Sequence, residues 1–364
     1  MAHRVVNSLA AFAIAGLAAC SRPVQPAPHL PPDAAIVEAG SAHGVIPDSV
    51  GIAWRFDAGE AVTQPAVSAG NVTVLVSGRS VTALDTRTGT RFWARSLGGP
   101  VIGAPARDAE RVYVATRTRD ERVHALDAAR GRDIWSQRLG DVRTAAAIAG
   151  RHLLIGNGRG ELIALDVATG GVQWRAPFAG AAVGTPFVHG AHAMITTERD
   201  TLYRVTLESG EIDARVSLGA TVSAPATLDE HRLVLALHSR EIVAYGLPEL
   251  VELWRTAVDD VVLARPFIDE GDVVVATRSS TVWRVAHDGT ASRMAHPGGS
   301  ITSAFLVAGG RYVLGRLDGS LLCLERDGRE VWRVDLGSSI VAGITASGGA
   351  LLVGLLDGGL VQIR

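Results

Sequence analysis

The chain has 364 residues, of which 41 are glycine, 47% are apolar and 5% are aromatic, and its formal net charge is −2. Abundant glycine with short apolar runs is typical of an all-β protein, and the near-neutral charge lacks the basic excess that marks nucleic-acid-binding proteins. All 35 basic residues are arginine, which excludes a P-loop and any Schiff-base mechanism because both require lysine.

The N-terminal segment has the features of an export signal. It begins with His3 and Arg4 and continues into an apolar run, Ala10–Ala19, that is too short to span a bilayer. The run ends in Leu17-Ala18-Ala19-Cys20, which resembles the lipobox of bacterial lipoproteins, where the chain is cut before the cysteine. The pattern predicts a lipoprotein signal peptide over residues 1–19. The alternative is an ordinary signal peptide followed by an incidental cysteine.

Residues 20–50 are expected to form a lipidated tether. By the same resemblance, Cys20 carries two or three acyl chains, and such a set anchors stably whereas one chain binds only marginally. The residue after the cysteine is Ser21 rather than aspartate, which by resemblance to enterobacterial sorting favours the periplasmic face of the outer membrane. Five prolines between Pro23 and Pro32 favour an extended segment.

A tryptophan returns every 39 to 42 residues along the rest of the chain, in one frame. Two positions of that frame, Ala214 and Arg293, have lost the ring. A period near 40 with β-rich segments predicts a propeller, in which each unit buries its faces against its neighbours. The framed tryptophans, which we expect to be structural docking residues, are Trp54, Trp93, Trp135, Trp174, Trp254 and Trp332.

Each unit reads as four short strands. In the first unit, Val62–Ser68 is an apolar strand interrupted by Pro65, and Val72–Val76, Ser80–Asp85 and Arg91–Ser96 follow after turns. The same pattern recurs at Val101–Gln137, Val142–Arg175, Ala182–Arg215, Val222–Arg255, Val262–Met294 and Ile301–Arg333.

The strongest subpattern is Ala-Leu-Asp, three residues, glycine, three residues, tryptophan. Clean copies run from Ala83 to Trp93, from Ala125 to Trp135 and from Ala164 to Trp174. The aspartate oxygen can accept hydrogen bonds from the tight turn, and the glycine takes the positive φ there. The small alanine makes room for the indole of a neighbouring strand.

The number of blades follows from how the chain closes. Seven complete units end at Arg333, and the remaining stretch offers only three strands, within Ile340–Ala346, Ala350–Gly354 and Gly359–Ile363. The missing fourth is available at the other end, in Ile52–Phe56. The sequence therefore predicts an all-β, eight-bladed propeller whose last blade is closed by the N-terminal strand, which leaves no open edge.

This spacing resembles the tryptophan-docking repeat of the PQQ-like (pyrroloquinoline-quinone-type) β-propeller family, and the resemblance covers residues 51–364. The chain has no Trp-Asp dipeptide, so the WD40 class fits poorly. Dehydrogenases of the PQQ-like family use calcium and carry a ring of adjacent cysteines beside the quinone. This chain has only Cys20 and Cys323, and the latter occupies the frame position of Ala83, where a small buried residue is expected. We therefore expect no cofactor.

Other candidate sites favour structural interpretations. His189 and His192 flank a predicted hairpin turn without a third ligand nearby. Asn157–Gly160 imitates a phosphate loop, but no helix follows it, so it is interpreted as another hairpin turn. The acidic pairs Asp259-Asp260 and Asp269-Glu270 lie at strand ends, where solvation is expected. No catalytic residue and no metal ligand is predicted, and the interpretation is that the protein is not an enzyme.

The family resemblance implies a non-enzymatic, lipid-anchored scaffold. Its expected partners are a barrel-assembly subunit and nascent outer-membrane proteins, its attachment to the membrane is by lipid alone, and the propeller is expected to be monomeric, with no nucleic-acid partner. Members with this role carry a Leu-Arg-Gly-type loop and an Asp-x-Asp loop, which the corresponding junctions Gly180–Pro186 and Asp259–Pro266 lack, so no interface residue is assigned. The alternatives are a ligand-binding or sensor propeller and a degenerate quinone-binding domain.

Overall fold

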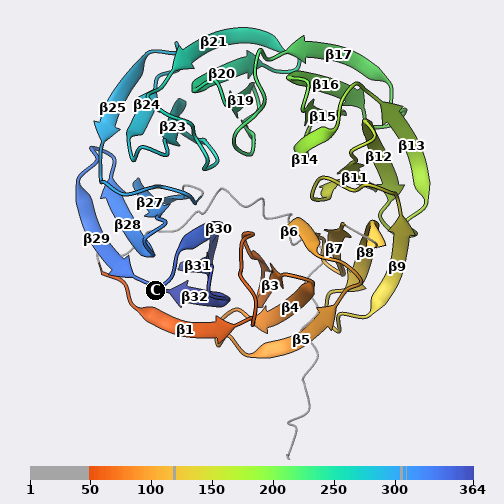
Figure 1. The fold of residues 1–364 in the computed structure, drawn as a ribbon, viewed down its shortest axis with the longest axis horizontal. Coiled ribbons are helices and arrows are strands. Elements are labelled where there is room, and N and C mark those ends of the chain that lie inside the picture. Colours follow the sequence, from red (N-terminus) through yellow and green to blue (C-terminus); the bar gives the residue numbers. More distant parts are fainter. Residues whose placement is uncertain (1–48, 118–119, 304–305, 309) are drawn as a thin grey trace, which may run out of the picture.

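The computed structural model describes residues 49–117, 120–303, 306–308 and 310–364, so the predicted signal peptide, Cys20 and most of the tether lie outside the described residues. In this part of the chain, thirty-two strands form eight four-stranded sheets. The sheets stand around a common axis as the blades of a propeller (Figure 1). The predicted all-β, eight-bladed fold is confirmed.

Seven blades are built from four strands that follow one another in sequence, with the innermost strand first. Blades 1 to 4 contain β2 (Val67–Ala69), β3 (Val72–Ser77), β4 (Ser80–Asp85) and β5 (Arg91–Ser96); β6 (Val101–Arg107), β7 (Arg111–Thr116), β8 (Arg122–Asp127) and β9 (Asp133–Arg138); β10 (Ala147–Ala149), β11 (His152–Gly156), β12 (Glu161–Asp166) and β13 (Val172–Pro177); and β14 (Ala182–His189), β15 (His192–Thr197), β16 (Thr201–Thr206) and β17 (Ile212–Ser217). Blades 5 to 7 contain β18 (Thr227–Leu228), β19 (Arg232–Ala236), β20 (Glu241–Gly246) and β21 (Val251–Ala257); β22 (Phe267–Asp269), β23 (Asp272–Ala276), β24 (Val282–Val285) and β25 (Ala291–Ala295); and β26 (Leu306–Ala308), β27 (Arg311–Gly315), β28 (Ser320–Glu325) and β29 (Glu330–Asp335).

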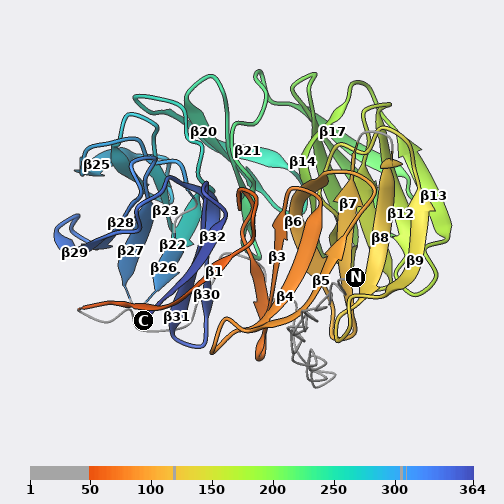
Figure 2. The same ribbon diagram turned by 60° about the horizontal axis from the view of Figure 1, so that its bottom comes forward.

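The eighth blade joins the two ends of the chain. Its outermost strand pairs antiparallel with the C-terminal strand (Figure 2). In this pairing Arg55 lies opposite Val361. Beyond the strands, the amide of Gly51 donates to the carbonyl oxygen of Arg364 at 2.6 Å, and the amide of Arg364 donates back at 3.0 Å. The closure is therefore as predicted. The blade consists of β30 (Ile340–Ser347), β31 (Ala350–Leu355), β32 (Gly359–Ile363) and β1 (Ile52–Asp57).

The innermost strand of blade 1 is shorter than the sequence predicted. The strand expected over Val62–Ser68 is β2, which begins only at Val67, after Pro65. Proline has no amide hydrogen and cannot donate to a strand ladder, so it interrupts pairing and is tolerated at the edge that faces the axis. In β14, which continues through Pro186, the register with β15 is broken between Val183 and Phe187.

The core lies between the blades. Val74 and Ala83 of blade 1 belong to the same buried cluster as Val112 and Leu126 of blade 2. Because each sheet is covered on both faces, its inner strands read as almost continuous apolar runs rather than as an alternation. Every residue of β3 is buried, for example.

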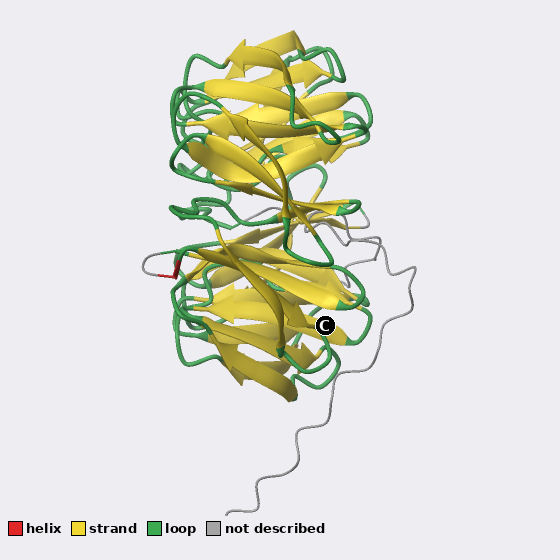
Figure 3. Ribbon diagram, turned by 90° about the vertical axis from the view of Figure 1, so that its right-hand side faces the viewer, coloured by secondary structure: helices red, strands yellow, loops and turns green. Residues whose placement is uncertain are grey.

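Seen edge-on, the strands run between two faces on which the loops gather (Figure 3). The outer strands form the rim, and the first strand of each blade faces the axis (Figure 1). No helix within the described ranges is long and apolar enough to cross a bilayer.

Candidate functional site

Trp93 shows how a framed tryptophan contacts the following blade. From β5, its indole nitrogen donates a hydrogen bond to the carbonyl oxygen of Ala128 in blade 2, at 2.9 Å. The ring lies against Gly131, where a Cβ atom would come within 2.4 Å of ring carbon Cε3. Gly131 also has a φ of +67°. Glycine at this position therefore allows both the left-handed turn and the close approach of the indole.

The same contact recurs around the ring. At three further junctions the indole nitrogen donates to a carbonyl oxygen of the next blade: Trp54 to Thr86 at 3.1 Å, Trp135 to Val167 at 3.0 Å, and Trp174 to Leu207 at 2.7 Å. Trp254 packs against Gly289 of blade 6.

The motif aspartate closes the turn that the tryptophan contacts. Asp85 Oδ1 accepts the amide hydrogens of Arg87 and Thr88, each at 2.9 Å. Ala83 lies opposite Trp93 in the β4–β5 register. Cys323 takes the same place opposite Trp332 and is fully buried.

The two junctions that lack a framed tryptophan are held differently. Between blades 4 and 5, Ala214 replaces the indole, and the position that holds glycine elsewhere in the frame is Leu250, which adopts a φ of +61°. Ala214 packs against a buried cluster that contains Leu250 and Leu247. At this junction, aliphatic side chains of the receiving blade therefore pack against the position that carries tryptophan elsewhere.

Between blades 6 and 7, where Arg293 replaces the tryptophan, a buried ionic cluster joins the blades. The carboxylate of Asp269 is only 5% exposed and accepts hydrogen bonds from the hydroxyl of Tyr312 at 2.7 Å and from Arg326 at 3.0 Å. Arg284 approaches the same carboxylate at 3.5 Å. The expectation that Asp269 is solvated is wrong, because the following blade covers this end of its strand. Burial and the hydrogen bond to Asp269 raise the pKa of Tyr312.

The other acidic pair forms a polar cluster between blades 5 and 6. Asp259 accepts hydrogen bonds from the hydroxyls of Thr281 and Ser279 and from the indole nitrogen of Trp283, at 2.5, 3.1 and 2.9 Å. Burial alone would raise the pKa of Asp259, but these hydrogen bonds outweigh it and lower the pKa to about 2. The neighbouring Asp260 binds Arg278 at 3.0 Å.

The histidine pair flanks the β14–β15 hairpin, as the sequence indicated. His189 contacts the carbonyl oxygen of Glu230 at 2.9 Å, and His192 contacts Asp213 at 3.1 Å. Among the described residues, no three histidine, cysteine, aspartate or glutamate side chains are placed to hold a metal ion. Asn157 closes the β11–β12 turn by accepting the amide hydrogens of Arg159 and Glu161.

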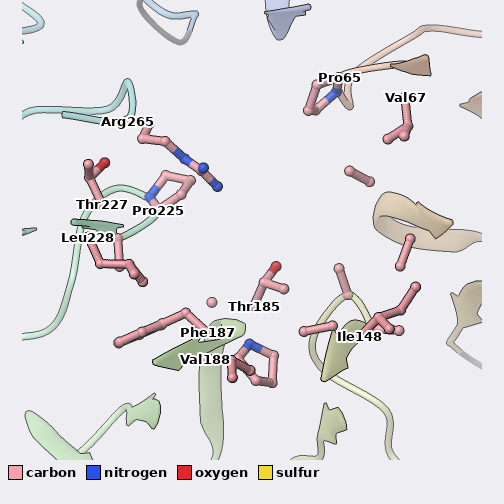
Figure 4. Close-up of a pocket in the computed structure, with 18 of the residues that line it drawn as sticks. Pro65, Val67, Ile148, Thr185, Phe187, Val188, Pro225, Thr227, Leu228 and Arg265 are labelled. Atoms are coloured by element: carbon pink, nitrogen blue, oxygen red, sulfur yellow. The ribbon is translucent and has the colours of Figure 1, made fainter. Parts of the chain in front are cut away.

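A cavity of about 480 Å³ lies on the axis and is lined by the first strands of blades 1 to 6 (Figure 4). We call it the central cavity. The side chain of Arg265 extends into it beside Pro225. The sequence analysis assigned no residue here, although a proline recurs at one of two adjacent positions of the repeat in five of these blades. The prolines of the wall are Pro65, Pro105, Pro186, Pro225 and Pro266.

A second arginine belongs to the wall of the central cavity. Arg107 of β6 is 6% exposed and donates a hydrogen bond to the carbonyl oxygen of Val72 at 3.1 Å. Its Nε atom is buried without a hydrogen-bond partner among the described residues. Burial lowers the pKa of Arg107 to about 10, with the charge of Asp108 acting in the opposite direction, so the guanidinium remains charged at neutral pH.

The closed eight-bladed ring and its glycine-backed tryptophans define a propeller of the tryptophan-docking class. A family model described as "Outer membrane protein assembly factor BamB" matches the chain over residues 39–138, 119–213, 198–296 and 280–364. The chain belongs to this family. A relative in Yersinia pestis, named outer membrane protein assembly factor BamB, is 23% identical over 272 residues, which is 66% of this chain and 68% of the relative.

Solved structures show that several kinds of protein share the fold. BamB from Moraxella catarrhalis superimposes with a TM-score of 0.73 at 14% identity, over 87% of this chain and 98% of that one. Quinohemoprotein alcohol dehydrogenase from Comamonas testosteroni gives 0.70 at 14% identity, over 86% of this chain and 76% of the enzyme. Because BamB and an alcohol dehydrogenase both appear at this level of likeness, the fold alone does not determine the function.

Proposed function

We propose that this chain is a non-enzymatic, lipid-anchored scaffold that assists the assembly of outer-membrane β-barrel proteins through protein–protein contacts. The observation that carries the proposal is the family match, which extends over the whole propeller from residue 39 to residue 364. The lipobox-like Leu17–Cys20 and the proline-rich segment after it support attachment at the periplasmic face of the outer membrane.

The geometry of the propeller suits such a role. Its outer strands leave one backbone edge per blade at the rim, and unpaired strand edges bind extended peptides by backbone hydrogen bonding. Unfolded outer-membrane strands have that chemistry. We therefore expect weak and broad binding to barrel-derived peptides, together with a specific contact to a subunit of the assembly machinery.

The test is mild crosslinking in native envelopes, detergent solubilisation and pull-down of the full-length protein, followed by identification of the bound proteins. We expect a barrel-assembly subunit among them. A preparation of the Trp93→Ala variant, which weakens the fold rather than a surface, serves as a control for unspecific capture. Titration of the purified domain with quinone and calcium tests the enzymatic alternative, and tight quinone binding with dye reduction would refute the scaffold proposal.

A ligand-binding or sensor propeller is the second candidate function, and the central cavity is the observation that favours it. If envelopes repeatedly yield no assembly subunit while the protein remains folded and anchored, this candidate replaces the scaffold.

A further inference from the structure

The outermost strand of blade 5, β21, forms an open edge at the rim of the propeller (Figure 1). It pairs with β20 along one side, and no strand pairs with its other side. Among the described residues, no backbone group of β21 forms a backbone hydrogen bond outside this ladder. The free side of the strand therefore offers unpaired backbone donors and acceptors to a partner.

The side chains that β21 exposes are aliphatic. Val251 is 61% exposed and Leu253 is 51% exposed, and no other outer strand within the described ranges carries two exposed large apolar side chains. Several other outer strands begin or end with an exposed residue that discourages strand pairing, such as Arg91 in β5, Arg138 in β9 and Pro177 in β13. With seven residues, β21 is also the longest described outer strand. Its apolar edge is therefore an exception in this ring.

The two charged side chains of β21 interact within the protein. The carboxylate of Glu252 accepts hydrogen bonds from Arg255 at 2.8 Å and from the hydroxyl of Tyr245 at 3.4 Å. Arg255 also donates to the carbonyl oxygen of Leu218, which follows the outer strand of blade 4, at 3.2 Å. Because both charges of β21 are paired, a charged side chain laid over its edge would lose water without gaining a counter-charge.

The chemistry of this edge specifies what can cover it. The partner is extended, because an added strand satisfies the unpaired backbone groups of a sheet edge. Its side chains next to Val251 and Leu253 are apolar and uncharged, since apolar cross-strand neighbours stabilise a strand pair. Transmembrane β-strands meet both conditions, because they carry apolar residues at every second position and few charges in that row.

We propose that β21 is the edge to which an unfolded transmembrane β-strand of an outer-membrane protein adds, with its apolar row beside Val251 and Leu253. The inference rests on the proposed scaffold function and assigns the capture of extended segments to one blade of the eight. The seven residues of β21 are enough to pair with most of a transmembrane strand, which has about ten residues.

The test measures binding of three fluorescent peptides to the purified full-length protein by anisotropy. The first peptide, of about ten residues, alternates valine with threonine and has an arginine at each end for solubility. The second has the same composition with the valines in one block. The third is the first with three consecutive N-methylated residues at its centre, which lack backbone donors. We expect the second and third peptides to bind about tenfold more weakly than the first. Equal binding of all three, or no binding of the first at millimolar concentration, would overturn the proposal.

Two matched variants locate the binding edge. Leu253→Lys should weaken binding of the first peptide about tenfold, because an aliphatic contact is lost and the new charge has no partner. Ile134→Lys is the control and should bind as the wild type does. Ile134 is 45% exposed on β9 and directly precedes the framed Trp135, just as Leu253 precedes Trp254. Thermal unfolding checks that both variants are folded. Unchanged affinity in a folded Leu253→Lys, or an equal loss in Ile134→Lys, would contradict the assignment to β21.

Two further measurements separate this inference from its neighbours. In sedimentation, we expect the wild type and Leu253→Lys to be monomers; a wild-type dimer that Leu253→Lys dissociates would overturn the proposal, because β21 would then pair with a second copy of the chain. Crosslinked pull-down from envelopes tests the scaffold by itself. If the wild type recovers an assembly subunit but binds no alternating peptide, this inference fails and the scaffold function stands. If it binds the peptide at β21 but recovers no subunit, the scaffold function fails alone.

Discussion

At the scale of single residues, the glycine of the repeat has two tasks, and only one of them was predictable. The Ala-Leu-Asp-x3-Gly spacing indicated a tight turn that needs a positive φ. The structure adds that Gly131 is also the surface on which Trp93 of the preceding blade rests. That contact joins two successive repeats. The sequence pattern describes the turn within one repeat and does not show which residues of neighbouring repeats touch.

Replacing a framed tryptophan should remove most of a junction between blades. For Trp93→Ala we expect a loss of roughly 3–5 kcal/mol in the free energy of unfolding, typical for a large aromatic side chain deleted from a core. Trp135→Ala and Trp174→Ala should cost similar amounts. Trp283→Ala, outside the frame, is the control and should cost less. Chemical denaturation measures all four, and silent loss of the framed rings would contradict a structural role.

Alanine substitutions at two glycines with a similar positive φ separate two contributions to the loss of stability, backbone strain and steric crowding. Gly131 (φ +67°) would place a Cβ atom 2.4 Å from Trp93, whereas Gly150 (φ +58°) has no atom within 4 Å of such a Cβ. Gly150→Ala should therefore lose only about 1 kcal/mol from strain, and Gly131→Ala clearly more. If denaturant titrations gave equal losses in the free energy of unfolding for the two variants, the Trp93 indole would have to move away from the added methyl group at no cost.

The carboxylate of Asp259 makes stability depend on pH in a defined window. Its pKa of about 2 lies below that of an unfolded aspartate, so its ionised form stabilises the fold above about pH 4 and that contribution is lost as the pH falls toward 2. Asp259→Asn should lower the melting temperature at pH 7, and the gap from the wild type should narrow between pH 4 and pH 2. A constant gap would mean that the hydrogen bonds, rather than the charge, matter.

At the scale of elements, the number and order of strands followed from the sequence, whereas the length of the innermost strand of blade 1 did not. Apolar residues on both sides of Pro65 suggested one strand over Val62–Ser68, yet pairing begins at Val67. The apolar pattern reports burial, and in this region burial comes from the neighbouring blades and the axis as well as from the sheet. The expectation that Asp269 is solvated was wrong for a related reason, because its hydrogen-bond partners Tyr312 and Arg326 belong to the next blade.

The closing strand pair is the element on which the ring depends. Deleting Leu360–Arg364 removes nearly all of β32, including the fully buried Leu360 and Val361 and the register partners of β1. We expect the domain to unfold or to melt at a much lower temperature. Deleting Arg364 alone removes only the exchange with Gly51 and should have a small effect. Identical melting of the five-residue deletion and the intact protein would contradict closure.

At the scale of the whole molecule, the ring tolerates the loss of its repeat at two junctions because other contacts join the blades there. The buried cluster around Leu250 packs against Ala214 between blades 4 and 5, and the Asp269 cluster joins blades 6 and 7. The sequence showed that the tryptophans were missing at Ala214 and Arg293, but it did not show the substitutes, which use unrelated residue types. Blade count was nevertheless predictable, because it depends on the period and on the strand left over at the N-terminus.

We propose that lipidation of Cys20 determines the position of the whole molecule in the cell. Lipidation requires its sulfur, so Cys20→Ser should leave the protein soluble in the periplasm or as an unprocessed precursor, whereas we expect the wild type to sediment with the outer membrane. The matched control is Cys323→Ala, because alanine occupies that frame position at Ala83 and Ala125 and the anchor is untouched. Metabolic labelling with a palmitate analogue should mark the wild type and Cys323→Ala but not Cys20→Ser. A wild type that stays unlabelled would show that the lipobox-like sequence is an ordinary signal peptide.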